Sequence, residues 1–206
     1  TGALTLTLSP RLKSGQPADP DTFSLDEAAT NGRHRWLLAG SWRVTENLAP
    51  EVLVFGGEGS SPQLGFNLST LAGDSIVLFG EAAFGQGPSL AAAAGLAPVK
   101  SVRQQRAAFG LTYTAPMNLS VTVEAEYNSA APTLAQWRSL QATNPSAGLA
   151  LLGAASVAQE LPVRKALFTY LTWKDAFVRR VDLSAFVRYE LMTDRLGARR
   201  QPSTSG

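Results

Sequence analysis

An all-β fold, in which antiparallel strands run up and down in sequence order, is predicted by three features of the chain. Apolar residues alternate with small, hydroxylic or acidic residues over stretches of up to about ten residues. Turn-forming residues such as Gly, Pro, Asn and Asp separate several of these stretches. Long and short connections alternate along most of the chain. These features predict about nine strands.

The clearest pair of strands covers residues 106–128, with a break at residues 115–117. A strand rises about 3.3 Å per residue, so each arm of this hairpin would reach roughly 30 Å. That length exceeds the usual strand of a soluble protein and suits a tilted strand that crosses a bilayer. One face of the hairpin is apolar in both arms: Ala107, Phe109, Leu111, Tyr113, Leu119, Val121, Val123, Ala125 and Tyr127.

The preceding half of the chain supplies five further strands. The first alternates Leu4, Leu6 and Leu8 with hydroxylic residues. The third is the weakest, because the segment around Val54 is apolar on both faces. The predicted strands of this half are residues 3–9, 34–44, 51–59, 64–69 and 75–85, with a polar connection at residues 10–33 and turns at residues 46–50, 60–62 and 72–74.

The following half contains two long connections and a final hairpin. A connection rich in Ala, Gly and Pro is predicted at residues 86–105. The longest connection covers residues 129–162, and its Ala and Leu content favours short helices at residues 133–141 and 146–159. Alternation returns at residues 164–173 and 181–190, which predict the last two strands, joined by residues 174–180.

The lengths of the connections point to a class of protein. In an up-and-down sheet the short turns at residues 72–74, 115–117 and 174–180 lie at one end, and most long connections lie at the other. Residues 60–62 are the exception. Short periplasmic turns and longer extracellular loops are typical of outer-membrane barrels. Alternation alone does not show whether the apolar face meets lipid or a protein core, because soluble barrels and sandwiches alternate too.

Composition narrows the class further. Charged residues make up 17% of the 206 residues and the net charge is +2, whereas an ordinary soluble domain has about 25% charged residues. The basic residues are scattered, so no nucleic-acid surface is expected. The absence of cysteine excludes disulfides and thiolate metal sites. No apolar run is long enough for a membrane-spanning helix. No signal-peptide pattern is present, and both ends look cut from something longer.

Aromatic residues near the strand ends indicate that the apolar face points outward and meets lipid. Trp and Tyr gather at the headgroup boundary of membrane barrels, because an apolar ring with a polar tip suits that boundary. The alternative is that these rings belong to an ordinary protein core. The candidate membrane-interface aromatics are Trp36, Trp42, Phe84, Tyr113, Tyr127 and Tyr189.

The opposite face is small and polar, with isolated charges. A solvated face of a soluble protein would carry far more Lys and Glu. Charges that line a pore set its ion preference, although opposite charges inside a narrow barrel also pair across strands. The lumen-lining candidates are Arg35, Arg43, Asn67, Glu81, Arg106, Glu124, Glu126, Asp182, Arg188 and Glu190.

No enzyme chemistry is predicted, and neither is a catalytic residue, a metal or another cofactor. His34, the only histidine, lies at a boundary between a connection and a strand. Glu124 and Glu126 share a face because of the alternation. The acidic residues within residues 17–27 lack the spacing of a calcium-binding EF-hand, so a solvated loop is the better interpretation.

In its long alternating strands, the tight turn at residues 115–118 and the strand-end Tyr127 and Tyr189, the chain resembles the porin-like outer-membrane β-barrel proteins of Gram-negative bacteria. The resemblance implies an antiparallel up-and-down transmembrane β-barrel in the cell outer membrane, with membrane lipid as its partner. Bacterial single-chain barrels have an even number of strands, and the aromatic-ended final strand of the class is missing. We therefore expect a partial barrel over residues 1–190 and a polar loop or tail over residues 191–206.

The expected function is a passive channel or transport conduit for small polar solutes, with a lumen narrowed by inward folding of residues 129–161. One alternative is a closed structural or adhesion barrel that acts through its extracellular loops, with Arg43, Glu81, Glu124 and Arg188 paired internally. Another is a soluble β-sandwich binding module whose apolar faces are buried. The solute and the oligomeric state are not specified by the sequence.

Overall fold

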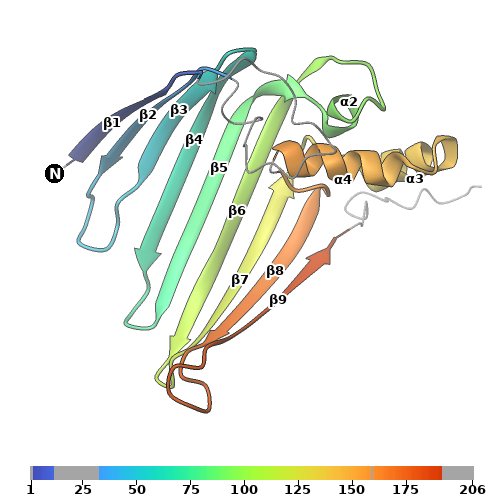
Figure 1. Cartoon of the computed structure of the whole chain (residues 1–206). Coiled ribbons are helices and arrows are strands. Elements are labelled where there is room, and N and C mark those ends of the chain that lie inside the picture. The colour runs from blue at the N-terminus through green and yellow to red at the C-terminus, as the bar shows by residue number, and fades with distance from the viewer. Residues whose placement is uncertain (1, 12–32, 159, 192–206) are drawn as a thin grey trace, which may run out of the picture.

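The structure, a computed structural model, describes residues 2–11, 33–158 and 160–191. It contains one nine-stranded antiparallel sheet in which each strand pairs with its neighbours in sequence (Figure 1). This confirms the prediction of an all-β, up-and-down sheet. The sheet curls without closing, because β1 and β9 are its two edges. The strands are β1 (Gly2–Ser9), β2 (Arg35–Trp42), β3 (Glu51–Gly57), β4 (Ser60–Leu71), β5 (Ile76–Pro88), β6 (Ser101–Ala115), β7 (Leu119–Asn128), β8 (Lys165–Trp173) and β9 (Leu183–Glu190).

The hairpin of β6 and β7 forms as predicted. Its register runs without a shift from Arg106 opposite Asn128 to Ala115 opposite Leu119. Its tight turn places Asn118 at a φ of 59°, a left-handed conformation that Asn adopts more readily than most residues. The segment with the strongest alternation is therefore also one of the most regular parts of the sheet.

The predicted connection at residues 86–105 is wrong at both ends. Gln86 pairs with Arg103 and Pro88 pairs with Ser101, so β5 and β6 continue beyond the alternating segment. Backbone hydrogen bonds do not depend on side-chain polarity. Pairing can therefore extend where the apolar pattern has stopped, and the connection shortens to residues 89–100.

The predicted turn at residues 60–62 is also wrong. β4 already begins at Ser60, which pairs with Gly57, and residues 58–59 make the turn. Gly59 has a φ of 74°, a conformation that glycine adopts without steric cost. The turn is thus placed by the glycine and not by the proline that follows it.

The two faces of the sheet differ in chemistry and exposure. One face, which contains Phe109 and Val123, carries apolar side chains from all nine strands, and many of them are exposed; Phe109 is 69% exposed. The other face, which contains Glu81 and Glu124, is richer in polar and charged side chains, although it also carries Phe79 and Phe168, and it is mostly half-buried. Side chains on the concave side of a curled sheet converge and shield one another. We therefore call the polar face the inner face and the apolar face the outer face.

Within the part of the chain that the structure describes, three helices lie in the connections at one end of the sheet (Figure 1). They are α2 (Leu90–Ala93), α3 (Leu134–Thr143) and α4 (Ala147–Ala158). The two helices predicted within residues 129–162 are confirmed; α2 was not predicted. Thr133 caps α3, and its side chain accepts a hydrogen bond from the backbone of Gln136. A small apolar core joins the three helices, with Leu90 and Leu151 almost fully buried.

The two ends of the sheet carry different connections. The helical connections at residues 89–100 and 129–164 and the turn at residues 58–59 are at one end, here the long-loop end (Figure 1). Residues 43–50, 72–75, 116–118 and 174–182 are at the other, the short-turn end. The acidic patch within residues 17–27 lies outside the described residues, as does all of the predicted tail except Leu191. Among the described residues, no helix is long and apolar enough to span a membrane.

Candidate functional site

The candidate site is the inner face of the sheet, and most of the predicted lumen-lining residues lie on it. Two do not lie on a strand. Arg43 follows the end of β2, and Asp182 precedes β9, where its carboxylate accepts a hydrogen bond of 3.1 Å from the backbone of Asp175. Both belong to short-turn connections. The register places the other eight on the inner face: Arg35, Asn67, Glu81, Arg106, Glu124, Glu126, Arg188 and Glu190.

Three carboxylates gather near the middle of the inner face. Glu81 pairs with Ala108, and Ala108 pairs in turn with Glu126. Glu124 faces Gly110 on the same strand as Ala108. β6 presents only these small residues between the carboxylates of β5 and β7, although the Phe79 ring of β5 lies over Gly110. Among the described residues, none of the three carboxylates forms a hydrogen bond or an ion pair.

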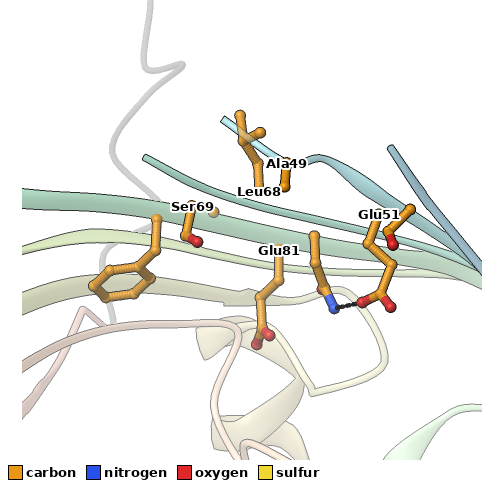
Figure 2. Close-up of a pocket in the computed structure, with 9 residues that line it drawn as sticks. Ala49, Glu51, Leu68, Ser69 and Glu81 are labelled. Carbon is orange, nitrogen blue, oxygen red and sulfur yellow. Dashed lines mark hydrogen bonds between the residues drawn. The ribbon is translucent and has the colours of Figure 1, made fainter. Parts of the chain in front are cut away.

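Of these three carboxylates, Glu81 alone lines an open depression of about 460 Å³. Figure 2 shows Glu51 and Glu81 projecting from the same side of the sheet. The Asn67 amide donates a hydrogen bond of 3.1 Å to a Glu51 carboxylate oxygen. Sequence reasoning missed Glu51, because its strand is apolar on both faces and shows no clear phase. The depression is lined by Ser41, Ala49, Glu51, Asn67, Leu68, Ser69, Phe79, Gly80 and Glu81.

A polar network at the long-loop end joins the inner face to the helical connection. Arg106 forms an ion pair with Glu160, which follows α4 in the chain. The Arg106 guanidinium also donates hydrogen bonds of 3.2 Å to Gln63 and 2.9 Å to Gln104. Arg106 was predicted to line the lumen; its partner Glu160 was missed because 54 residues separate the two.

The same connection is held by two side chains that form hydrogen bonds with its backbone. The Asn128 side chain donates to the carbonyl of Leu161 at 2.8 Å and accepts from the backbone of Ala130 at 2.9 Å. Arg164 donates to the carbonyls of Ser129 and Ala131. Both ends of the helical connection are therefore fixed to the long-loop ends of β7 and β8.

One further charge pair lies on the inner face, near the edge of the sheet. Arg188 and Glu190 are 3.9 Å apart on the same strand and both are exposed. Exposed pairs of this kind contribute little, about 0–1 kcal/mol. The pairing of Arg188 is thus weak, and the predicted internal pairing of Glu81 and Glu124 is not found among the described residues.

The predicted aromatics all project from the outer face, and the register divides them between the two ends. Phe84 of β5 pairs with Gln105 of β6. Tyr127 of β7 pairs with Ala107, which lies two residues further along β6 toward the short-turn end. Tyr127 also pairs with Lys165 of β8. Tyr189 of β9 pairs with Leu167, which lies two residues further along β8 toward the short-turn end. The long-loop band thus steps steadily toward the short-turn end from strand to strand. It consists of Trp36, Phe84, Tyr127 and Tyr189.

A second aromatic band lies toward the short-turn end and shows the same stagger. Tyr113 of β6 pairs with Val121 of β7, and Val121 pairs with Leu171 of β8. Trp173 lies two residues beyond Leu171 along β8, toward the short-turn end. Trp173 was missed by the sequence analysis, although it shares the outer phase of its strand. Its indole donates a hydrogen bond of 3.1 Å to the carbonyl of Met117. The short-turn band consists of Trp42, Tyr113 and Trp173.

Evidence for other chemistry is sparse. Within the described ranges, no group of three or more His, Cys, Asp or Glu side chains is arranged to hold a metal ion. His34 accepts a hydrogen bond of 3.2 Å from the backbone of Arg11 at the long-loop end. No protein-family model, curated protein or solved structure matches the chain.

Proposed function

We propose that the chain forms the wall of a transmembrane β-barrel in a cell outer membrane, and that its inner face lines a conduit for small polar solutes. The observation that carries this proposal is the combination of an exposed apolar outer face with an inner face that carries most of the charged side chains of the strands. Fully burying one leucine- or phenylalanine-sized side chain is worth about 1.5–3 kcal/mol. Lipid covers such a face without requiring a second protein layer.

The stagger of the aromatic bands supports the same orientation. Each band shifts by about one residue per strand. A rise of about 3.3 Å across a strand spacing of about 4.8 Å corresponds to a tilt of about 35° if the bands lie parallel to the membrane. Strands of outer-membrane barrels tilt by about 35–45°. The aromatic positions are therefore consistent with two membrane interfaces crossed by tilted strands.

The chemistry of the inner face supports the proposed conduit. Its carboxylates at Glu81, Glu124 and Glu126 are not neutralised by neighbouring cations among the described residues. The contact between Glu160 and Arg106 brings the end of the helical connection onto the inner face. This contact supports inward folding of part of residues 129–161, which would narrow the conduit at the long-loop end.

A closed structural or adhesion barrel is the second candidate, favoured by one observation. The network around Arg106, Asn128 and Arg164 fixes the helical connection rigidly to the sheet. Such rigidity suits a surface that binds a partner through its loops. This candidate predicts no solute flux, which separates it from the conduit.

Solubility and conductance test the proposal together. The full-length protein is purified with and without detergent, and the folded material is run on gels before and after heating. A barrel folds in detergent and shows a heat-dependent shift in mobility. Purified protein in planar bilayers then distinguishes a conduit, which gives discrete conductance steps, from a closed barrel, which gives none. Monodisperse folding in plain buffer would refute both candidates and favour a soluble sandwich.

A further inference from the structure

We infer that the connection between β8 and β9 docks onto the headgroups of anionic phospholipids in the leaflet that meets the short-turn end. This inference rests on the proposed barrel and adds a lipid class to its partners. The docking surface combines exposed apolar and cationic side chains of two adjacent connections, at residues 116–118 and 174–182 (Figure 1). We call it the basic-apolar surface, and it consists of Met117, Lys174, Phe177, Val178, Arg179 and Arg180.

The apolar part of this surface continues the short-turn aromatic band. Phe177 lies edge-on against the ring of Trp173, and the two ring centroids are 4.9 Å apart. The hydrogen bond from the Trp173 indole to the carbonyl of Met117 brings the β6–β7 turn alongside. Phe177, Val178 and Met117 are 77%, 64% and 62% exposed. These apolar side chains are therefore held at the margin of the outer face and are not packed beneath the turn.

The cations of the surface are exposed, whereas the carboxylates beside them are bonded to backbone. The Asp175 carboxylate accepts a hydrogen bond of 2.6 Å from the backbone of Arg180, and the Asp182 carboxylate accepts one of 3.1 Å from the backbone of Asp175. Among the described residues, Lys174, Arg179 and Arg180 form no ion pair. Their cationic groups are therefore available to an anion from outside the chain.

The backbone of the connection is fixed in this shape. The Ala176 amide donates to the carbonyl of Val181 at 3.0 Å, and the Val181 amide donates to the carbonyl of Val178 at 3.1 Å. Arg180 has a φ of 72°, a left-handed conformation that costs a side-chain-bearing residue steric energy. Its bond to the Asp175 carboxylate stabilises that conformation. Because the connection is ordered before it meets a ligand, docking loses little conformational entropy.

Anionic headgroups match both parts of the surface. Arginine binds phosphate oxygens through paired N–H donors, and lysine adds a point charge. Apolar side chains beside such cations insert at the boundary between headgroups and acyl chains, where binding increases with buried apolar area and with anionic lipid. A soluble acidic partner would satisfy the cations, but it would not account for apolar side chains that continue the proposed lipid-facing band.

The other short-turn connections lack this combination. Residues 72–75 contain Asp74 and no cation, and residues 43–50 contain Arg43 together with Glu46. We therefore expect the preference for anionic lipid to reside in the basic-apolar surface and not in the short-turn end as a whole.

Fluorescence in vesicles of defined composition tests the inference. The chain contains no cysteine, so Val178→Cys in the full-length protein carries one environment-sensitive fluorophore. The labelled protein is folded into phosphatidylcholine vesicles with and without phosphatidylglycerol. Quenching by lipids brominated near the headgroup is compared with quenching by aqueous iodide. The triple variant Lys174→Gln, Arg179→Gln, Arg180→Gln is compared with Arg43→Gln, which removes an exposed cation from another connection at the same end.

We expect phosphatidylglycerol to increase quenching by brominated lipid and to reduce quenching by iodide. Each cation near an anionic membrane surface raises the binding constant about fivefold. The triple variant should therefore lose most of the effect of phosphatidylglycerol, as should the natural side chains at high salt, whereas Arg43→Gln should keep it. Native mass spectrometry of detergent-purified protein equilibrated with both lipids should show preferential retention of phosphatidylglycerol, which the triple variant loses.

Equal quenching in both kinds of vesicle, unchanged in the triple variant, would overturn the inference. Quenching by iodide without quenching by brominated lipid would also overturn it and would leave the surface to a soluble acidic partner. The heat-dependent gel shift verifies that each variant is folded. Phe177→Ser keeps every charge and should weaken quenching by brominated lipid while the preference for phosphatidylglycerol persists. The absence of the gel shift in the unmodified protein would instead refute the proposed barrel itself.

Discussion

Arg106 and Glu160 form an ion pair that fastens the end of the helical connection to the inner face of β6, although 54 residues separate them in the chain. Their side chains are 29% and 15% exposed. The pair is therefore partly shielded from water, and the Arg106 guanidinium is held further by Gln63 and Gln104.

Replacing Glu160 with Gln should loosen the helical connection and destabilise the folded protein. Hydrogen bonds to charged groups contribute about 1.5–3 kcal/mol, so we expect a loss near the lower end of that range for this partly exposed pair. In bilayers the variant should show larger or noisier conductance steps. The matched control is Glu190→Gln, which removes an exposed pair worth at most about 1 kcal/mol. Equal effects of the two variants would contradict a special role for Glu160.

Removing negative charge from the middle of the inner face should reduce preference for cations. We expect the cation-to-anion permeability ratio, measured from reversal potentials in a salt gradient, to fall toward one in the double variant Glu81→Gln, Glu124→Gln. Acidic residues that line a pore favour cations. Glu58→Gln is the control, because it removes one carboxylate from the turn at residues 58–59, outside the wall. An unchanged ratio in the double variant would show that these carboxylates do not face the conduit.

The outer face should tolerate charge poorly if it meets lipid. Phe109 lies midway between the two aromatic bands, and Phe109→Arg should destabilise the folded protein in bilayers by about 2–4 kcal/mol. Thr112→Arg places the same charge on the inner face of the same strand, where we expect a much smaller effect. Urea titration of protein folded into vesicles measures both. If Phe109→Arg were harmless, the outer face would be exposed to water.

The close packing between Phe79 and Gly110 predicts that alanine is tolerated worse at position 110 than at Gly153 in α4. A Cβ atom on Gly110 would lie 2.3 Å from the carbonyl oxygen of Val123 and 2.7 Å from the Phe79 ring. Backbone must shift to relieve such contacts, so Gly110→Ala should cost about 1–3 kcal/mol. In α4 a Cβ atom on Gly153 would meet nothing within 4 Å, and Gly153→Ala should stabilise the protein by up to about 1 kcal/mol. Thermal or urea unfolding of both variants checks the signs.

A pH-dependent contact lies at the long-loop end, between Glu58 and Arg11. The hydrogen bond from Arg11, and then one from the backbone of His34, lower the pKa of Glu58 below its ordinary value of 4.5. A lowered pKa in the folded state stabilises the fold above the pKa of the unfolded chain, and this contribution disappears as the pH falls through the lowered value. Titration of the Glu58 carboxylate by NMR should show a higher pKa in Arg11→Gln. An identical titration in both proteins would contradict the contact.

The strands could be predicted from the sequence because the alternation of apolar and polar side chains involves only residues that are neighbours in the chain. The β6–β7 hairpin, its turn and the two helices after Asn128 follow from side-chain period, turn chemistry and helix propensity. The same pattern separated an apolar face from a polar one and placed eight of ten lumen-lining candidates on the inner face. It failed where alternation was absent, at the extensions of β5 and β6 and at Glu51 on a strand that is apolar on both faces.

The tertiary structure decided what depends on register and on contacts between distant segments. Sequence alone does not set Glu81 beside Ala108 and Glu126, align Trp173 with Tyr113, or bring Glu160 to Arg106. Each of these relationships requires knowing which residues face each other across strands, and a shift of two residues in register preserves the alternation while changing every neighbour. The chain by itself thus determined a two-faced, up-and-down sheet, whereas backbone pairing between strands decided where its charges and aromatic rings meet.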